Sequence, residues 1–443
     1  MAEAEPKEES SRKALSYSKF YGGKVTVAPN VPVRSLDDFS IWYTPGVAAV
    51  SKAIEADRDL SFDYTGRWNT VAVVTDGSRV LGLGNIGPEG ALPVMEGKAL
   101  IYNYLGGVNA IPLPIRVKDE EELIGFVKAL EPSLGGVNLE DIESPKCFDI
   151  LDRLRAEMAI PVWHDDQQGT AGVTLAALFN ALEITGRKLS RTRIVLFGAG
   201  AANVAAERLL AEAGADPRQI IVLDSKGILH PEREDIDQLM LRNRWKYEIA
   251  MRTNGDRITG GLKEALKGAD ALVAAAGPGP GVIRKDEIAV MNKRAITFFL
   301  ANPVPEMLPD AAVAAGAEVV ATGRSDYPNQ VNNSLLFPAI FRGALDARAK
   351  TITDAMVIDA ATELASFARE KGLSRNYIIP TMVQWEVYPR VAAKVGQAAI
   401  REGVARKKLS AAESLGAATK MIEHSRKIMN LMRRDGLIVD PPE

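Results

Sequence analysis

Two pairs of adjacent acids are the residues of this sequence best placed to do chemistry. Glu140-Asp141 ends the stretch "VNLED" and Asp165-Asp166 ends "PVWHDD", each directly after a short apolar run typical of a buried strand. In a parallel sheet, ligands bind beyond the carboxyl ends of the strands. If the two strands are neighbours, four carboxylates converge there, and such crowding is unfavourable without a shared cation or proton. The matched placement therefore favours a metal site over solvated turn residues or helix N-caps.

The ligand chemistry narrows the choice of metal. Carboxylate oxygens suit Mg²⁺ or Mn²⁺, whereas zinc more usually recruits histidine or cysteine. The chain has only 3 histidines and 1 cysteine. We expect His164, which lies directly before the second acidic pair, to be a packed strand-end residue without a catalytic role. The sequence therefore predicts a site for a hard divalent cation.

The stretch "IVLFGAGAANVAAERLL" has the order of strand, Gly-x-Gly turn and helix that binds dinucleotides. Gly198 permits the tight turn, and Gly200 lets the backbone approach a pyrophosphate at the positive end of the helix. We assign Ala199 and Ala201 of the same turn to the cofactor site as well. Asn203 replaces the usual third Gly or Ala, so the helix either lies slightly farther from the sheet or offers a side-chain donor to phosphate. A turn that binds no phosphate is the alternative.

Asp224 strengthens the dinucleotide interpretation. It ends the next expected strand, in "VLDSKG", where a carboxylate can bind the ribose hydroxyls of the cofactor. The sequence therefore predicts a nicotinamide cofactor. Asp224 should repel the 2′-phosphate of NADP while the nearby Lys226 could attract it, so the choice between NAD and NADP stays open with a lean towards NAD.

Lys98 lies among apolar residues in "VMEGKALIY", on an expected helix. A lysine in that setting usually extends its amine to solvent. Burial beside a cation would instead lower its pKa and make it a plausible base at neutral pH. Tyr43, in "WYTPGVAAVS", precedes Thr-Pro at an extended-to-helical junction, where an aromatic side chain commonly just packs.

Further polar residues could contact a small acidic substrate. Arg79 follows an expected turn and could clamp a carboxylate through two hydrogen bonds, or could equally be a solvated turn residue. Asn302, in "LANPVPE", ends a strand of the dinucleotide fold and should face its crevice. Asn332 and Asn333, in "YPNQVNNSLLFP", need hydrogen-bond partners if buried, although loop asparagines more often form turns.

The elements that position these residues alternate between strand and helix patterns. Residues 69–85 contain two β-rich runs around Asp76-Gly77, which predicts a hairpin. A helix is expected from about Pro88 to Leu105, since this segment starts with Pro and ends at a double Gly. Short apolar runs then alternate with amphipathic helices, which indicates a largely parallel sheet.

A second alternating series follows the basic turn "TGRKLSRTR". Its expected strands, joined by helical segments, describe a doubly wound dinucleotide fold, and the chain is mainly helical from about residue 353. We therefore expect an α/β protein with an N-terminal α/β catalytic domain (1–163), a Rossmann-like doubly wound parallel-sheet NAD(P)-binding domain (164–400) and a helical C-terminal extension (401–443). The strands of the second series are expected at 193–197, 219–223, 270–275, 295–300 and 317–321.

Composition excludes several classes of protein. The 54 basic and 57 acidic residues nearly cancel, to a formal net charge of -3, so no field that would bind nucleic acid is evident. No apolar run approaches the ~20 residues of a membrane-spanning helix. Cys147 is the single cysteine and fits a reducing compartment, and the polar start "MAEAEPKEESSRK" lacks the apolar segment of a secretion signal. We expect a soluble, cytoplasmic protein with a frayed N-terminal tail.

Long blocks of the sequence resemble the malic enzyme family, in particular its shorter prokaryotic branch. The resemblance runs from about "YSKFYGGK" to near residue 400, and chance agreement of all the blocks in order is not credible. It implies oxidation of L-malate with NAD or NADP, decarboxylation to pyruvate, a need for Mg²⁺ or Mn²⁺, and a homodimer or higher homo-oligomer. The blocks are "WYTPGVA", "VVTDGSRVLGLGNIGPEGALPVMEGKALIY", "VNLEDIESPKCFDIL", "IPVWHDDQQGTA", "FGAGAAN", "LANPVPE" and "GRSDYPNQVNNSLLFPAIFRGAL".

The resemblance also implies roles for individual residues. Lys98 would accept the C2 hydroxyl proton, Tyr43 would protonate C3, and Asp165 would tune the lysine. Two other functions stay open: a metal-dependent oxaloacetate decarboxylase without net redox chemistry, and a non-catalytic dinucleotide-binding sensor. The implied metal ligands are Glu140, Asp141 and Asp166, the substrate-binding residues are Arg79, Asn302 and Asn333, and the cofactor-binding residues are Gly198, Ala199, Gly200, Ala201, Asn203, Asp224 and Asn302.

Overall fold

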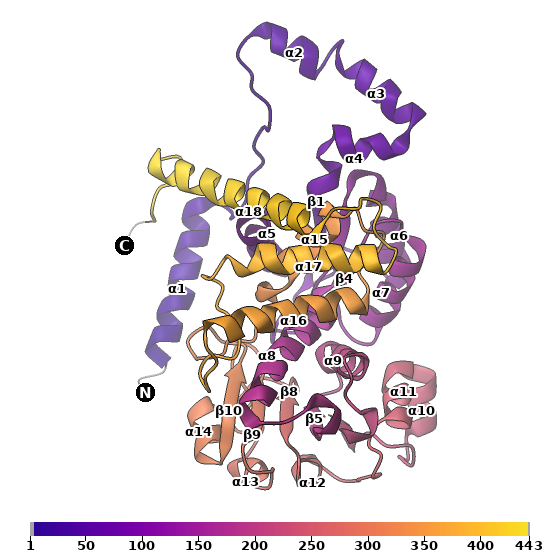
Figure 1. Cartoon of the computed structure of the whole chain (residues 1–443), viewed down its shortest axis with the longest axis vertical. Helices are drawn as coiled ribbons and strands as arrows, with labels where there is room; N and C mark the ends of the chain where they lie inside the picture. The colour runs from indigo at the N-terminus through magenta and orange to yellow at the C-terminus, as the bar shows by residue number, and fades with distance from the viewer. Residues whose placement is uncertain (1–3, 442–443) are drawn as a thin grey trace.

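The computed structural model describes residues 4–441, with side chains from residue 9 onward. It contains two sheets with helices packed on them (Figure 1). The first sheet lies in the upper part of Figure 1 and the second at the bottom. Two long helices, α8 (Thr170–Thr185) and α16 (Asp354–Lys371), lie between them in this view, and α17 (Val387–Arg401) packs against α16.

The first sheet is parallel and has the strand order β2-β1-β3-β4. Its central strand carries the apolar run from Val71 to Val74, which is fully buried, as expected for an inner strand of a parallel sheet. The expected strand and helix alternation is confirmed. The elements are β1 (Thr70–Thr75), α5 (Gly87–Gly106), β2 (Asn109–Pro114), α6 (Glu120–Leu130), β3 (Gly136–Leu139), α7 (Lys146–Glu157) and β4 (Val162–His164).

The hairpin expected at residues 69–85 is wrong. Only its first half is a strand, β1, because β2 and β3 occupy both edges of that strand and leave no place for a hairpin partner. The second half is a loop, in which the Gly77 carbonyl accepts the N–H groups of Ile86 and Gly87. The loop leads directly into α5, which has a proline in its first turn and stops at Gly107 (φ 61) much as expected.

The second sheet has the order β10-β9-β8-β5-β6-β7, a doubly wound arrangement whose direction of winding reverses between β5 and β8. All the expected strands are confirmed, and a short antiparallel strand, β7, is added beside β6. The strands are β5 (Ile194–Phe197), β6 (Ile220–Asp224), β7 (Gly227–Ile228), β8 (Ala271–Ala274), β9 (Ala295–Phe299) and β10 (Ala317–Thr322). The helices are α9 (Ala201–Glu212), α10 (Ile236–Arg242), α11 (Arg244–Arg252), α12 (Leu262–Leu266), α13 (Lys285–Ile288) and α14 (Pro309–Ala314).

One apolar core joins the two sheets. It runs from β1 through α8, whose residues are buried on nearly all sides, to β5 and the helices that follow the second sheet. Among residues 4–441, no helix is both long and apolar enough to cross a membrane. The remaining helices of this region are α15 (Phe337–Asp346) and α18 (Ala411–Arg434). Short turns of helix are η1 (Arg58–Leu60), η2 (Gly66–Asn69), η3 (Glu131–Ser133), η4 (Asp165–Gly169), η5 (Leu189–Arg191), η6 (Pro217–Gln219) and η7 (Asn333–Leu335).

The N-terminal region differs from the frayed tail that we expected. Helix α1 (Ala4–Tyr21) is formed, and the Tyr21 hydroxyl donates a hydrogen bond of 2.7 Å to the carbonyl of Val439. Residues 1–3 lie outside the described part. After α1 come α2 (Leu36–Trp42), α3 (Val47–Ala56) and α4 (Ser61–Tyr64). Residues 24–56, called the arm below, project above the rest of the molecule in Figure 1.

Candidate active site

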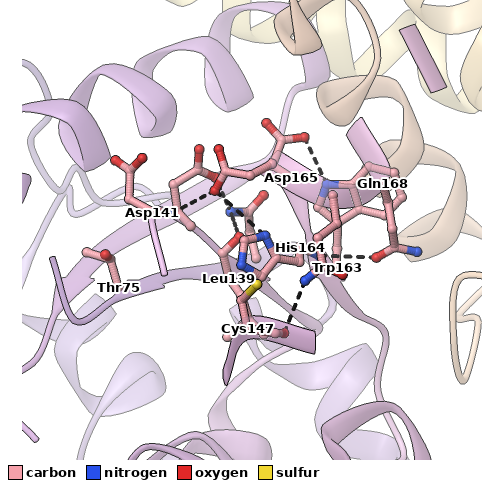
Figure 2. Close-up of polar contacts among 12 residues, drawn as sticks. Thr75, Leu139, Asp141, Cys147, Trp163, His164, Asp165 and Gln168 are labelled. Atoms are coloured by element: carbon pink, nitrogen blue, oxygen red, sulfur yellow. Dashed lines mark hydrogen bonds and ion pairs between the residues drawn. The ribbon is translucent and has the colours of Figure 1, made fainter. Parts of the chain in front are cut away.

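The carboxyl ends of β3 and β4 bring the two acidic pairs together. These strands are parallel neighbours with Leu139 opposite His164, so the acids that follow each strand emerge side by side. One oxygen from each of Glu140, Asp141 and Asp166 lies within 4.8 Å of the others. Figure 2 shows Asp141, His164 and Asp165 gathered at these strand ends. The expected convergence of acids is therefore present in the fold.

Backbone contacts hold Asp141 in position. Its N–H donates to Oδ2 of Asp166 at 2.8 Å, and its Oδ1 accepts the N–H of Leu81 at 3.2 Å. Its carbonyl accepts the N–H of Arg79 at 3.0 Å, so the loop after β1 holds both the carbonyl and the side chain of this residue. Asp141 adopts φ 53, a left-handed conformation that costs energy for any residue but glycine and is common at functional sites.

The acidic cluster fits a divalent cation. Asp141 Oδ2 is buried and has no hydrogen-bond partner among the described residues, although buried carboxylate oxygens are normally satisfied. Burial, together with the charge of Asp166, raises the pKa of Asp141 to about 7, and burial raises the pKa of Glu140 despite the nearby Lys98. Burial and the neighbouring carboxylates disfavour the charged form of these two residues, and a bound cation would favour it. The oxygen donors match Mg²⁺ or Mn²⁺.

His164 does not add a nitrogen ligand that would favour zinc. Its side chain is completely buried, and Nδ1 lies 3.7 Å from Oδ2 of Asp166, beyond hydrogen-bond distance. Burial lowers the pKa of His164 to about 4, so the ring is neutral at physiological pH. The donor set therefore remains one of carboxylate oxygens.

Lys98 is buried between the two acidic pairs. Its ammonium lies 2.7 Å from Oε1 of Glu140 and is hydrogen-bonded to Oδ2 of Asp165, and it faces the ring of Phe337 at 4.5 Å. Burial alone would lower the pKa of Lys98, but the charges of Asp165 and Glu140 outweigh burial and raise it. A cation bound beside it would push this pKa down again.

The two residues of the second acidic pair contact different partners. Asp166 faces Asp141, whereas Asp165 faces Lys98. Asp165 also accepts the indole N–H of Trp163 at 3.0 Å (Figure 2). A π-helical turn, η4, produces this divergence, and such turns are frequent at functional sites. A side chain at Gly169 would collide with the Asp165 carboxylate, so the turn needs glycine at that position.

Supporting residues complete the first sheet's part of the site. Asn138 is fully buried in β3, donates to Oε2 of Glu140 at 2.9 Å and accepts the hydroxyl of Tyr102 at 2.7 Å. We did not identify Asn138, Tyr102 or Trp163 from the sequence. The only available signal was a polar residue within the apolar run "GVNL".

The glycine turn after β5 has the shape of a dinucleotide site. Gly198 has φ 99, and a Cβ there would meet the Ala275 carbonyl oxygen at 2.5 Å. At Gly200, the N-cap of α9, a Cβ would meet nothing within 4 Å, so this side of the turn is open. Ala199 is buried in the turn, and Ala201 is the first residue of α9.

Asn203 is not a free donor to phosphate. Its side-chain amide donates to the carbonyls of Phe197, at 3.0 Å, and Val273, at 3.4 Å, and it is buried. It therefore ties α9 to β5 and β8, which is how the third position of the turn is filled without glycine or alanine.

Asp224 is enclosed by cations. Its Oδ1 accepts the N–H of Lys226 at 2.9 Å and a guanidinium N–H of Arg233 at 3.0 Å, and its Oδ2 lies 3.1 Å from the amine of Lys246. Burial raises its pKa, but these donors and charges outweigh burial and lower it. Arg233 and Lys226 also pair with Asp235. Two carboxylates, those of Asp224 and Asp235, therefore face three cations. We did not predict this arrangement from the sequence.

The three expected substrate residues lie at the rim where the two sheets meet. The backbone of Gly82, in the loop that carries Arg79, packs against the carbonyl of Asn302 after β9. Asn333 lies close to Asp165, because a Cβ added at Gly169 would contact the Asp165 carboxylate and would lie 3.2 Å from the Cβ of Asn333. The side chains of Arg79 and Asn302 are exposed, while Asn333 is half-buried.

Tyr43 is not brought to this cluster within the chain. It lies at the end of α2 in the arm and is 71% exposed, whereas Lys98 is buried in α5. Figure 1 shows α2 and α3 well away from the strand ends. The sequence offered no signal for this separation.

Glu306 is a further residue that we did not identify from the sequence. Its side chain is fully buried, and its carboxylate accepts the N–H of Ala276 at 3.0 Å and the N–H of Ala301 at 3.2 Å. These two residues follow β8 and β9, so Glu306 holds together two loops beside the glycine turn. Burial raises the pKa of Glu306 to about 7.

Comparison with known proteins gives consistent matches. The family profile described as "Malic enzyme, NAD binding domain" matches residues 167–400, and "Malic enzyme, N-terminal domain" matches residues 22–123. The chain is 47% identical over 393 residues to the bifunctional malic/malolactic enzyme of Bacillus subtilis, covering 89% of this chain and 94% of that protein.

Relatives named for either nicotinamide are also similar. The NAD-dependent malic enzyme of Geobacillus stearothermophilus is 46% identical, over 87% of this chain and 78% of that protein. The NADP-dependent malic enzyme of Halomonas elongata is 41% identical, over 89% of this chain and 94% of that protein. The crystal structure of Entamoeba histolytica malic enzyme superposes with a TM-score of 0.95 at 44% identity, over 98% of this chain and 90% of that one.

Proposed function

Since the chain belongs to the malic enzyme family, we propose that it oxidises L-malate with a nicotinamide dinucleotide and decarboxylates the product to pyruvate and CO₂. One observation carries the proposal. A buried lysine lies between Glu140 and Asp165, directly beside a cluster of carboxylate oxygens suited to a divalent cation. This combination supports proton transfer from a hydroxyl next to a metal site.

Glu140, Asp141 and Asp166 would hold Mg²⁺ or Mn²⁺. When bound, the cation supplies charge that withdraws electrons from the C2 oxygen while CO₂ leaves, and the nicotinamide supplies the acceptor for hydride from C2. The unsatisfied Oδ2 of Asp141 supports this assignment. Asp166 is the most accessible of the three ligands, with a side chain 34% exposed, which leaves a side open for substrate.

Lys98 would accept the C2 hydroxyl proton as the alcohol is oxidised. Asp165 and Glu140 hold its amine in place and keep the side chain from leaving the buried site. Because Asp165 is fixed by Trp163 and the turn at Gly169, the amine has a single favoured position. Tyr43 would supply the proton that C3 gains after decarboxylation.

Arg79, Asn302 and Asn333 would bind the two malate carboxylates. Arg79 offers a planar donor that can pair with a carboxylate through two hydrogen bonds. The amides of Asn302 and Asn333 would donate single hydrogen bonds.

For the cofactor, we propose that the chain accepts NADP as well as NAD. The lean towards NAD assumed a bare carboxylate at Asp224 that repels a 2′-phosphate. Paired with Arg233 and Lys246, Asp224 no longer presents an uncompensated negative charge. The exposed Lys226, whose ammonium pairs with Asp235, lies directly beside it. The relatives named for each nicotinamide leave both possible.

Steady-state kinetics with malate and Mn²⁺, run with NAD and NADP in parallel, test the proposal. We expect reduced nicotinamide and pyruvate in equal amounts. Pyruvate formation from oxaloacetate without any malate oxidation would instead support the decarboxylase without net redox chemistry. Dinucleotide binding without turnover of either acid would support the sensor.

A further inference from the structure

A single buried carboxylate, that of Glu306, holds two loops at the carboxyl ends of the second sheet. Its Oε1 accepts the N–H of Ala276 at 3.0 Å, and its Oε2 accepts the N–H of Ala301 at 3.2 Å. Ala276 follows β8 and Ala301 follows β9, and these two strands are parallel neighbours. Each oxygen therefore binds one loop, and the side chain has no exposed surface.

The rest of the loop after β8 is held by the backbone of the same residue. This loop, residues 275–283, has the sequence "AAGPGPGVI". The Glu306 carbonyl accepts the N–H groups of Gly281 and Ile283 at 3.2 and 3.3 Å, so Glu306 holds both the start and the end of the loop. Glycine loses more conformational freedom on folding than any other residue, so this loop needs such contacts to keep one shape. Its glycines with positive φ are Gly277, Gly279 and Gly281.

The two loops lie where the dinucleotide turn and the substrate rim approach each other. The Ala275 carbonyl lies against the turn, since a Cβ added at Gly198 would lie 2.5 Å from its oxygen. In the other loop, the Asn302 carbonyl packs against Gly82 in the loop after β1. One carboxylate therefore fixes a segment beside the cofactor turn and a segment beside the expected substrate residues.

The charge of Glu306 has a specific use at this position. Burying a carboxylate costs energy unless other groups compensate its charge. Among the described residues no cation forms an ion pair with Glu306, and its carboxylate is compensated by backbone N–H groups. A glutamine would cost less to bury, but it has one acceptor oxygen, and its NH₂ group cannot accept the second N–H. Burial raises the pKa of Glu306 to about 7, so the carboxylate is mostly ionised at pH 8.

We propose that Glu306 is a positioning residue for hydride transfer, because it fixes the two loops that border the nicotinamide half of the cofactor. The inference rests on the proposed function and adds to it a residue that touches neither malate nor cofactor. A dinucleotide lies across the crevice where the winding of the sheet reverses, here between β5 and β8. Asp224, the expected ribose ligand, ends β6 on one side of this point, and β8 and β9 lie on the other side. The nicotinamide end therefore reaches the loops that Glu306 holds.

A comparison of two reactions tests the inference. A shift of either loop changes the distance between C2 of malate and the nicotinamide, and misplacement by about 1 Å can cost about 10²-fold in rate. We expect Glu306→Gln to lower kcat for malate oxidation by about 10- to 100-fold at pH 8 with saturating Mn²⁺. Decarboxylation of added oxaloacetate uses the metal site without hydride transfer, so its rate at saturating substrate should stay at the wild-type level.

Glu287→Gln is the matched control. Glu287 is also buried and accepts a backbone N–H, that of Arg284 at 2.7 Å. This bond caps α13 and holds neither Ala276 nor Ala301, so we expect the control to keep both rates. Thermal stability and Mn²⁺ affinity are measured for each variant alongside, and Glu306→Gln should keep the Mn²⁺ affinity of the wild type.

Unchanged malate oxidation in Glu306→Gln would overturn the inference. An equal loss of both reactions would overturn it too, since the residue would then only support the fold. Glu306→Asp keeps the charge but is one methylene shorter, and it is assayed with the same expectation in case the glutamine variant does not fold. Loss of folding in both variants would make Glu306 purely structural and would contradict the proposal. A wild-type protein that does not oxidise malate would instead refute the proposed function, and the inference would fall with it.

Discussion

The ammonium of Lys98 lies 2.7 Å from Oε1 of Glu140, a carboxylate that also belongs to the three-oxygen cluster with Asp141 and Asp166. The base and the metal site therefore share a carboxylate. A cation bound by Glu140 weakens the hold of that carboxylate on the ammonium and adds a repelling charge, and both effects favour the neutral amine that can accept a proton.

Replacing Lys98 should remove the base without disturbing the dinucleotide site. We expect Lys98→Ala to lower malate oxidation by about 10²- to 10⁴-fold, the usual contribution of a general base. Dinucleotide affinity, measured by protein fluorescence, should stay unchanged because the contacts of Lys98 are with Glu140, Asp165 and Phe337, outside the glycine turn. Lys128→Ala, at an exposed ion pair on α6, serves as the control. Loss of dinucleotide binding in the Lys98 variant would count against its assignment.

The two glycines of the dinucleotide turn should respond differently to alanine. Gly198→Ala places a methyl group 2.5 Å from the Ala275 carbonyl at a positive φ, so we expect a fall in thermal stability. Gly200→Ala meets no protein atom within 4 Å, so the fold should be kept while dinucleotide affinity falls, because the methyl group occupies the open side of the turn. Equal effects of both variants on stability and binding would contradict this account.

The cations around Asp224 should control the use of NADP. We expect Lys226→Ala and Lys246→Ala each to raise the KM for NADP by about tenfold, close to the loss of one charge contact, with a smaller change for NAD. Lys263→Ala, on the exposed surface of α12, is the control. Steady-state kinetics with NAD and NADP in parallel measure both KM values. Equal changes in the two values would show that these lysines do not recognise the 2′-phosphate.

Glu306 should make stability depend on pH. Its pKa is raised from 4.5 to about 7 by burial, so the folded state binds this proton more tightly than the unfolded state. Its stabilising contribution is complete below pH 4.5 and is lost as pH rises to about 7, a change of about 3 kcal/mol. Urea unfolding from pH 5 to pH 8 should show a smaller decline for Glu306→Gln than for the wild type. The same slope in both proteins would exclude this group as its source.

Much of the fold follows from local patterns. Apolar runs in β1, β3 and β4 predicted strands, and the acids after them predicted a metal site, because a parallel sheet collects its carboxyl ends at one edge. The hairpin failed because an Asp-Gly turn signal says nothing about which strands already occupy the edges of β1. The predicted tail is a helix instead, and a hydrogen bond from Tyr21 to the Val439 carbonyl joins the end of α1 to a residue near the C-terminus.

The sequence was least informative about contacts between residues that lie far apart along the chain. Neither the pairing of Asp224 with Lys246 nor the isolation of Tyr43 has a local signature, since both depend on how separate elements are placed. The buried Glu306 was equally hidden, because its partners are backbone groups of two loops.

Mn²⁺ binding tests the central claim most directly: that acids from two strand ends form one cation site beside Lys98. Titration of the protein with Mn²⁺, with free ion followed by electron paramagnetic resonance, should give a site that Asp166→Asn weakens by about tenfold or more, because one anionic ligand is lost. Asp152→Asn, at an exposed ion pair on α7, should bind Mn²⁺ as the wild type does. Unchanged Mn²⁺ affinity in Asp166→Asn would contradict the account.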